Sequence, residues 1–324
     1  MLAIGNAIVD VLADADDELL ARHDLVKGSM ELIDADRADV LYAAMPPGIE
    51  ASGGSAANTA VGVASFGGRA AFIGKVRDDQ LGAVFTHDIR AAGVAFDSTP
   101  ATSGPPTARC LILVTPDAER TMSTSLGVAV EVSVDDIDEA LVGRAAVTFC
   151  EGYLWDNDDT KAAIRHAMAV AQNAGRQVSL TLSDGFCVDR HRDEFLHELM
   201  VKSVDVLFAN EDEITSLYQV DTFDDALQRV RAEVPLAFLT RGAAGSVVVR
   251  GDELHVVDAV PVKVVDTTGA GDAYAAGALH GLTTGRDLAT CARLGSVAAS
   301  EVISHMGPRP HRALRELAAT VLDA

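Results

Sequence analysis

The sequence lacks the features of several protein classes, beginning with basic charge. Only 26 lysine and arginine residues stand against 48 acidic ones, giving a formal net charge of −22. A field of that sign repels nucleic acid and anionic membrane surfaces. No apolar stretch reaches membrane-spanning length, and the opening segment Met1–Gly5 is too short for the hydrophobic region of a signal peptide. The expected partner is therefore a small molecule.

Paired cysteines are also missing. Cys110, Cys150, Cys187 and Cys291 are far apart, form no C-x-x-C motif, and each lies in or beside an apolar run. Such cysteines are expected to be reduced, mostly buried thiols, which is typical of a cytoplasmic protein.

The common nucleotide-binding loops are absent too. The nearest candidate for a Walker A loop, Gly74-Lys75-Val76, lacks the Ser or Thr after lysine and a correctly spaced earlier glycine. Protein-kinase motifs are missing, and no Rossmann glycines follow the first predicted strand at residues 2–4. A phosphate site in this chain must therefore use another design.

What the chain does contain is a long alternation of strand and helix patterns. Predicted strands at 146–150, 178–182, 204–209 and 236–240 alternate with helices, which indicates a doubly wound, mostly parallel sheet flanked by helices. With 324 residues and 48% hydrophobic content, the chain can bury the core of one α/β domain spanning residues 1–324. Two β-rich excursions, at about 11–50 and 94–125, are expected to pair into a small lid.

The segment Asp266-Thr267-Thr268-Gly269-Ala270-Gly271-Asp272 has the composition of an anion site. It follows the apolar run 260–265, a predicted strand, and opens a small-residue helix at 273–284. The N–H groups and positive dipole end of a helix attract an anion, and glycines let the backbone approach it. Asp272 has two interpretations. It is an ordinary acid of the first helical turn, or a base that takes a proton from an incoming hydroxyl.

Polar side chains also occur after the first predicted strand and at the start of another small-residue helix. Each of them has a functional and a purely structural interpretation. Asn6 and Asp10 follow the first predicted strand, and Asn58 lies on the first turns of the small-residue helix after Gly53-Gly54. At the carboxyl ends of strands in an open α/β sheet, such groups can hydrogen-bond a polyol. Turn formation and helix capping are the alternatives.

Taken together, these segments resemble the ribokinase, or PfkB-type, family of carbohydrate and nucleoside kinases over essentially the whole chain. Residues 266–277 match the family's C-terminal signature, and Gly53-Gly54, Asn58 and Gly67 match its N-terminal one. Arg77 departs from that signature, because the family usually has glycine there. The resemblance implies a ribokinase-like fold with a lid, Mg²⁺ and ATP as cofactors, and transfer of the γ-phosphate to a hydroxyl by a monomer or homodimer.

The resemblance also implies roles for particular residues. Asp272 would be the catalytic base, and the backbone N–H groups of Gly269, Ala270 and Gly271 would hold the charge on the transferred group. Glu213 of the motif Asn210-Glu211-Asp212-Glu213 would order Mg²⁺ through water. The implied ATP-binding residues are Asn210, Thr240, Gly242, Gly245 and Arg120. For Arg120 a solvated strand charge is the alternative.

A potassium site is a further implication. Family members often bind K⁺ beside the equivalents of Asp266 and Thr268, aided by the loop at Gly307. This chain has Pro310-His311 where ribokinases place a serine, so K⁺ activation stays open.

The acceptor side most resembles adenosine kinases, which implies phosphorylation of adenosine at its 5′-hydroxyl to give AMP. A sugar kinase acting on ribose, fructose or 2-keto-3-deoxygluconate is the alternative, and a non-catalytic nucleotide-binding regulator is the least favoured one. The ribose is expected to contact Asn6, Asp10, Gly54 and Asn58. The expected purine walls are Leu126, Tyr153 and Phe186, for which ordinary core packing is the alternative.

Overall fold

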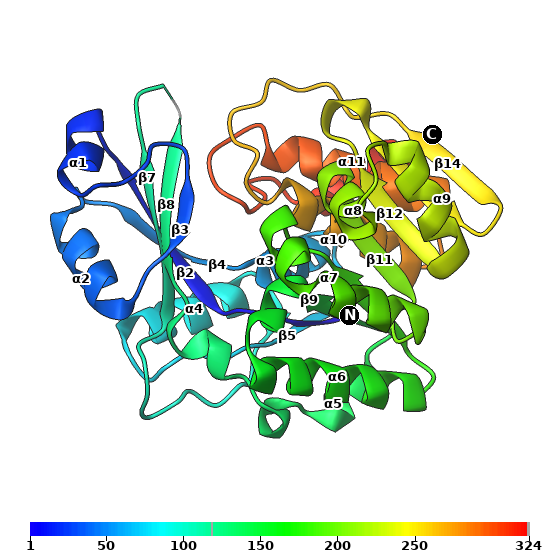
Figure 1. The fold of residues 1–324 in the computed structure, drawn as a ribbon, viewed down its shortest axis with the longest axis horizontal. Coiled ribbons are helices and arrows are strands. Elements are labelled where there is room, and N and C mark those ends of the chain that lie inside the picture. Colours follow the sequence, from blue (N-terminus) through cyan, green and yellow to red (C-terminus); the bar gives the residue numbers. More distant parts are fainter. Residues whose placement is uncertain (118, 323–324) are drawn as a thin grey trace.

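Two sheets of different size organise the chain in a computed structural model that describes residues 1–117 and 119–322 (Figure 1). The larger sheet has nine strands in the order β14-β13-β12-β11-β10-β9-β1-β5-β6. Its strands are β1 (Leu2–Ile4), β5 (Ala70–Ile73), β6 (Val94–Ala95), β9 (Val147–Glu151), β10 (Gln177–Thr181), β11 (Val206–Asn210), β12 (Leu236–Thr240), β13 (Ser246–Arg250) and β14 (Glu253–Val257).

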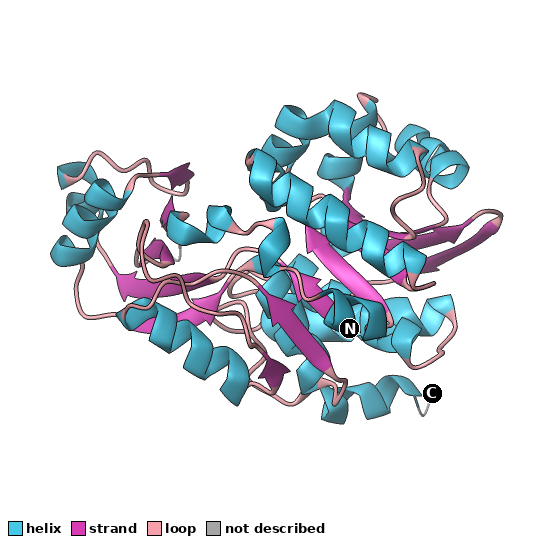
Figure 2. Ribbon diagram, turned by 90° about the horizontal axis from the view of Figure 1, so that it is seen from below, coloured by secondary structure: helices cyan, strands magenta, loops and turns pink. Residues whose placement is uncertain are grey.

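Strand direction in the larger sheet follows the expected βα alternation. Every pairing from β6 to β12 is parallel, whereas β13 and β14 add an antiparallel hairpin at one edge. Figure 2 shows these strands passing between two layers of helices. The predicted doubly wound, mostly parallel α/β fold is therefore confirmed.

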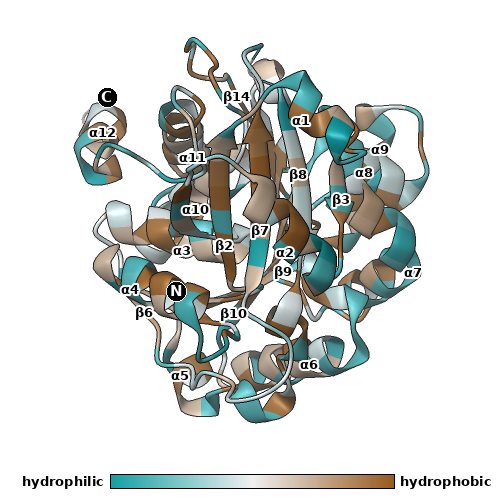
Figure 3. Cartoon of the chain, turned by 90° about the vertical axis from the view of Figure 1, so that its left-hand side faces the viewer, coloured by the Kyte–Doolittle hydropathy of each residue, from teal (hydrophilic) through white to brown (hydrophobic). Residues whose placement is uncertain are grey.

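Each helical layer has its own core. One layer contains α3 (Ser55–Ser65), α4 (Gln80–Ala91), α10 (Ala270–Thr283), α11 (Leu288–Val302) and α12 (Leu314–Leu322). The other contains α5 (Glu139–Arg144), α6 (Asp158–Asn173), α7 (Gly185–Met200), α8 (Glu211–Tyr218) and α9 (Phe223–Glu233). Figure 3 shows brown and teal residues side by side on helices such as α2 and α6, as expected where one side of a helix is buried.

The smaller sheet lies to the left in Figure 1 and has the strand order β3-β8-β7-β2-β4. Its strands are β2 (Ile8–Asp14), β3 (Met30–Leu32), β4 (Ile49–Gly53), β7 (Ala108–Val114) and β8 (Arg120–Ser125). Helices α1 (Asp17–Arg22) and α2 (Ala35–Ala44) belong to the same region. The two excursions thus share a sheet, although β2 begins earlier than expected and residues 94–95 pair with β5 of the larger sheet. Its action as a lid stays a prediction.

One expectation about an individual element was wrong. Residues 260–265 form no strand, because β14 ends at Val257 and the proline at 261 has no N–H for a ladder. The valines of this segment are instead 37–54% exposed.

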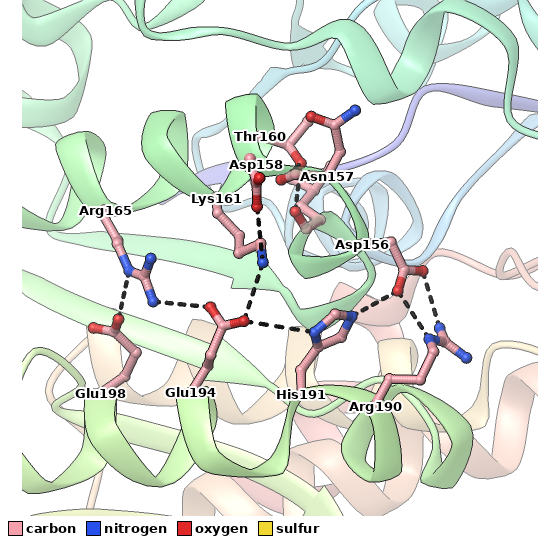
Figure 4. A network of polar contacts seen from close by, with 11 residues as sticks. Asp156, Asn157, Asp158, Thr160, Lys161, Arg165, Arg190, His191, Glu194 and Glu198 are labelled. Carbon is pink, nitrogen blue, oxygen red and sulfur yellow. Dashed lines mark hydrogen bonds and ion pairs between the residues drawn. The ribbon is translucent and has the colours of Figure 1, made fainter.

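Helix α7 is attached to α6 and to the 3₁₀ helix Gly152–Asp156, which follows β9, by a set of ion pairs (Figure 4). Arg165 of α6 bonds Glu194 at 3.1 Å and Glu198 at 2.7 Å, and Lys161 bonds Glu194 at 3.0 Å. Asp156 accepts from Arg190 and His191. These contacts fix the helix whose first turn carries Phe186.

Candidate active site

Asp272 lies in the first turn of α10, where two side chains of α3 hold its carboxylate. Ser55 Oγ donates to one oxygen at 2.6 Å and Asn58 Nδ2 to the other at 3.1 Å. Burial raises the pKa of Asp272, while these two donors and the nearby Arg309 oppose that rise. The carboxylate is thus oriented by donors and faces other titratable groups, the environment that a general base needs.

Small residues explain why α3 and α10 come this close. A Cβ placed on Gly62 of α3 would lie 2.5 Å from Cβ of Ala276 on α10, a separation that no larger residue tolerates. The small-residue pattern of both segments therefore serves helix packing, and this packing brings Asn58 to Asp272.

A second carboxylate, Asp10 of β2, faces the same region and is 8% exposed. Burial raises its pKa to about 7, an effect that the charges of Arg309 and Arg120 oppose and that of Asp272 reinforces. Gly54 begins α3 with φ of 93°, and a Cβ there would lie 2.3 Å from the carbonyl oxygen of Asn6. Asn6, Asp10, Gly54 and Asn58 are therefore brought together near Asp272, and their contact with an acceptor stays a prediction.

Behind this group lies Glu151, at the end of β9. Its carboxylate accepts from Asn6 N at 2.7 Å, Asn6 Nδ2 at 2.8 Å and Ala56 N at 2.9 Å. Burial raises its pKa to about 7 although these donors favour the ionised form. Glu151 thereby fixes the Asn6 amide, whose buried Oδ1 has no hydrogen-bond partner among the described residues. That oxygen can accept from a ligand hydroxyl.

The turn before α10 has the geometry of an anion site. Gly269 has φ of 76°, and a Cβ there would lie 2.7 Å from the carbonyl oxygen of Pro308, so only glycine suits this position. The 14-residue helix α10 starts at Ala270, and its first N–H groups lack partners within the helix. Gly269, Ala270 and Gly271 therefore form the turn at which the sequence predicts an anion hole.

A pocket of about 510 Å³ adjoins this turn, because Thr267, Ala270 and Gly271 are among its lining residues. Its lining includes Thr240, Gly242 and Gly245, which the resemblance assigns to ATP, as well as Ala270 and Gly271. The segment that was expected to be a strand contributes Val260, Pro261, Val262 and Val264 to the wall. An apolar pocket ending at a helix N-terminus suits a nucleotide base joined to phosphates.

Asn210 and Glu213 form a reciprocal cap at the start of α8. Asn210 Oδ1 accepts from Glu213 N at 2.8 Å, and the Glu213 carboxylate accepts from Asn210 N at 2.9 Å. Burial, with Asp184 and Asp212 nearby, raises the pKa of Glu213 to about 7. No cluster of three or more metal-ligating side chains occurs among the described residues. The donor set fits an ion held mainly by waters and phosphates, as Mg²⁺ commonly is.

Arg120 crosses from the small sheet to the turn before α10. Its guanidinium contacts Thr268 Oγ1 and Asp266, which also accepts from Thr268 N at 2.9 Å and Gly307 N at 2.7 Å. Arg120 is thus a buried ion-pair partner rather than a solvated strand charge. In this structure it supplies the positive charge beside Asp266.

The three expected purine walls differ in environment. Tyr153 packs partly against the core beneath α6 and α7, and burial raises the pKa of its hydroxyl, with Asp184 and Asp272 nearby. Leu126 is partly buried at the end of β8. Phe186 is 75% exposed, so it takes no part in core packing.

Three side chains of this site were missed from the sequence: Ser55, Glu151 and Arg309. Ser55 follows the Gly53-Gly54 pair, and Glu151 ends an apolar strand whose carboxyl end lies beside that of β1. Those positions are readable signals of site residues. Arg309 stands between two prolines and has no such signal.

Comparisons with known proteins agree with this geometry. The profile of the pfkB family of carbohydrate kinases matches residues 34–313. The crystal structure of adenosine kinase from Sinorhizobium meliloti is 52% identical, covers 98% of each chain and superposes with a TM-score of 0.92. A probable sugar kinase from Rhizobium etli CFN 42 is 49% identical over 98% of this chain and 97% of the other, with a TM-score of 0.93. Fructokinase-1 of Zea mays is 28% identical over 73% of this chain and 75% of its own.

Proposed function

Because the chain belongs to the pfkB family of carbohydrate kinases, and so is a phosphotransferase acting on a hydroxyl, we propose that its acceptor is adenosine. The product would be AMP, formed by transfer of the γ-phosphate of ATP to the 5′-hydroxyl. The observation that carries this proposal is the combination of polyol-binding polar groups around Asp272 with a large apolar face opposite them.

That apolar face lies on the small sheet. Leu12 is paired with Ile49 on one side and Ile112 on the other, and Met122 pairs with Ile112 and Met30. Paired residues of adjacent strands point to the same side of a sheet, so the five form one row. Met122 shares the side of Arg120, two residues earlier on β8, and Arg120 reaches Asp266. The row therefore faces the main domain.

An apolar row of this length suits a purine better than a bare sugar. Ile49 is 71% and Met30 44% exposed, which is unfavourable for large apolar side chains unless something covers them. Ile49 and Met30 lie at the two ends of the row, so a flat base on its middle would cover the partly buried Leu12 and Met122. Phe186 would be a further wall. A ribose alone would leave Leu12 and Met122 partly exposed.

In the proposed reaction Asp272 accepts the proton of the 5′-hydroxyl as that oxygen bonds the γ-phosphorus. The bond from the γ-phosphorus to the bridging oxygen breaks, and ADP leaves. The N–H groups of Gly269, Ala270 and Gly271 stabilise the charge on the transferred group. Asn6, Asp10 and Asn58 hold the ribose so that its 5′-oxygen faces Asp272.

The nucleotide would occupy the 510 Å³ pocket with its phosphates at the start of α10. Asn210 and Glu213 would order the water shell of Mg²⁺, whose charge neutralises the phosphates when it is bound. Arg120 would exchange its contacts with Asp266 and Thr268 for a phosphate oxygen.

Residues 11–50 and 94–125, which contain most of the small sheet, would act as a lid over the active site. Transfer to a hydroxyl must exclude water, or ATP is hydrolysed instead. Amide hydrogen exchange in these segments should slow when saturating acceptor is added. Unchanged protection would indicate a rigid site that is always covered.

A sugar kinase is the second candidate, because a probable sugar kinase and a fructokinase are among the similar proteins. Initial-rate assays with Mg-ATP over adenosine, inosine, ribose, fructose and 2-keto-3-deoxygluconate distinguish the two. The highest kcat/KM is expected for adenosine. A value for ribose or fructose at or above that for adenosine would replace the nucleoside with a sugar.

A further inference from the structure

Arg309 lies beside the acceptor site although it belongs to none of the motifs described above. Its Nε donates to Asn58 Oδ1 at 3.2 Å, and its Nη1 donates to Ser52 Oγ. Its Nη2 is buried without a hydrogen-bond partner among the described residues. Burial lowers the pKa of this guanidinium to about 10. A charged group with an unpaired buried donor is costly to keep, so its position calls for a functional explanation.

The bond to Asn58 fixes which way the amide of that residue points. Arginine can only donate hydrogen bonds, so it must face the amide oxygen. The NH₂ group of Asn58 is then directed to Asp272 Oδ2, at 3.1 Å. With Ser55 on the other oxygen, the Asp272 carboxylate is held by two donors, and Arg309 determines the orientation of one of them.

Arg309 also places a positive charge beside several buried acids. Asp10 of β2, Glu151 of β9 and the hydroxyl of Tyr153 face Asp272. The negative charge of Asp272 raises the pKa of each of these three groups. Arg309 is the nearby positive charge that acts on both Asp272 and Asp10, and Asp88 of α4 faces it from another side. Removing its charge would therefore favour the protonated form of Asp272.

The loop that carries Arg309 is held at several points. Pro308 packs against Gly269, Gly307 N donates to Asp266 at 2.7 Å, and Arg312 N donates to Glu301 at 2.9 Å. The guanidinium is thus delivered by a segment anchored to the turn before α10 and to α11. Its placement does not depend on a bound ligand.

We propose that Arg309 is a positioning residue for the catalytic base: through Asn58 it orients Asp272, and its charge keeps that carboxylate ionised before the acceptor hydroxyl arrives. The proposal rests on the proposed function only in requiring Asp272 as the base. It holds for any hydroxyl acceptor, nucleoside or sugar.

The test is the pH dependence of kcat/KM, which reports ionisations of the free enzyme. R309M and R309Q remove the charge, R309K keeps it, and R312M changes an exposed arginine of the same loop as a matched control. The acid limb should move up by about 1 pH unit in R309M and R309Q, a tenfold change in ionisation. In R309K and R312M it should stay near the wild-type position. The titration of Mg-ATP itself is common to all variants and cancels.

Orientation should appear in kcat, which is expected to fall roughly 10- to 100-fold in R309M and by less in R309Q, whose amide can still donate to Asn58. A comparison of D10N with D10N/R309M shows whether the shift of the acid limb comes from Asp272 or from Asp10. The shift should persist in the D10N background, where Asp10 has no charge. Acid limbs that coincide in wild type, R309M and R309Q would overturn the proposal. So would a shift that vanishes in the D10N background. If R309M fails to fold, R309Q carries the comparison, because its amide can still bond Asn58 and Ser52.

Failure of the adenosine proposal is a separate outcome. A wild-type enzyme that ignores adenosine but phosphorylates a pentose rejects the nucleoside. The pH profiles are then measured with that pentose, and the same limb shift decides the role of Arg309.

Discussion

The two ends of the candidate active site recognise their ligands by opposite means. The nucleotide pocket is lined mainly by valines, alanines, glycines and small hydroxyl residues, with Pro261, Tyr274 and Ile303, and no charged side chain occurs among its described lining residues. The acceptor end brings together Asp10, Glu151, Asp272 and Arg309, several of them with displaced pKa values. Apolar walls select by shape, whereas buried charges hold hydroxyls and move a proton. The chemistry therefore belongs to the acceptor end.

The largest expected effect is that of removing the base. D272N should lose roughly 10²-fold or more in kcat while retaining ATP binding, because the nucleotide pocket is built without that carboxylate. Turnover and calorimetric ATP titration measure the two ends separately. D252N, in the exposed turn between β13 and β14, is the control. Near wild-type turnover of D272N would contradict the claim that the acceptor end carries the chemistry.

Phe186 tests whether the acceptor end also has an apolar half. F186A should weaken adenosine use by roughly 1–3 kcal/mol in kcat/KM, because a purine loses one wall, and should hardly affect a bare pentose. The control is V201A, an exposed apolar residue at the far end of the same helix. Equal losses on both acceptors would mean that Phe186 does not contact the base.

Filling the nucleotide pocket should have a smaller effect confined to the other end. Ala299 lines that pocket, so A299F should raise the KM for ATP by about tenfold by occupying space meant for the base. The KM for adenosine should stay unchanged. An equal rise in both values would show that the two ends are not separate.

The smallest effect concerns stability. The pKa values of Asp10, Glu151 and Glu213 are raised to about 7 in the folded protein. Each therefore binds a proton more tightly in the folded than in the unfolded protein. This contributes to the free energy of unfolding, fully below about pH 4, and the contribution is lost as pH rises through about 7. E151Q removes one such group, so its Tm should fall less than that of wild type between about pH 5 and about pH 8. A fall of the same size in both proteins contradicts the burial of a protonatable Glu151.

The same contrast explains what the sequence alone could predict. Asp272, Gly269 and Asn58 could be predicted as site residues because their helices open with a glycine and a small-residue pattern. The βα alternation likewise indicated the parallel sheet, since a crossover leaves a regular trace in hydrophobic periodicity. Both signals are local in the chain.

Features that depend on distant contacts were not predictable. Arg309 reaches Asn58 across 251 positions, and nothing near it in the chain indicates this contact. The run 260–265 has the composition of a strand, but it contains Pro261 and pairs with no strand of either sheet. It became a wall of the nucleotide pocket instead. Tertiary context decided both cases.

The most direct test of the account is a competition between acceptors. Equal concentrations of adenosine and ribose are mixed with limiting Mg-ATP, and the products are identified by phosphorus NMR. The initial product ratio equals the ratio of the two kcat/KM values. The account predicts that AMP, carrying its phosphate on the 5′-oxygen, exceeds pentose phosphate by roughly tenfold or more. Pentose phosphate in equal or greater amount would contradict it.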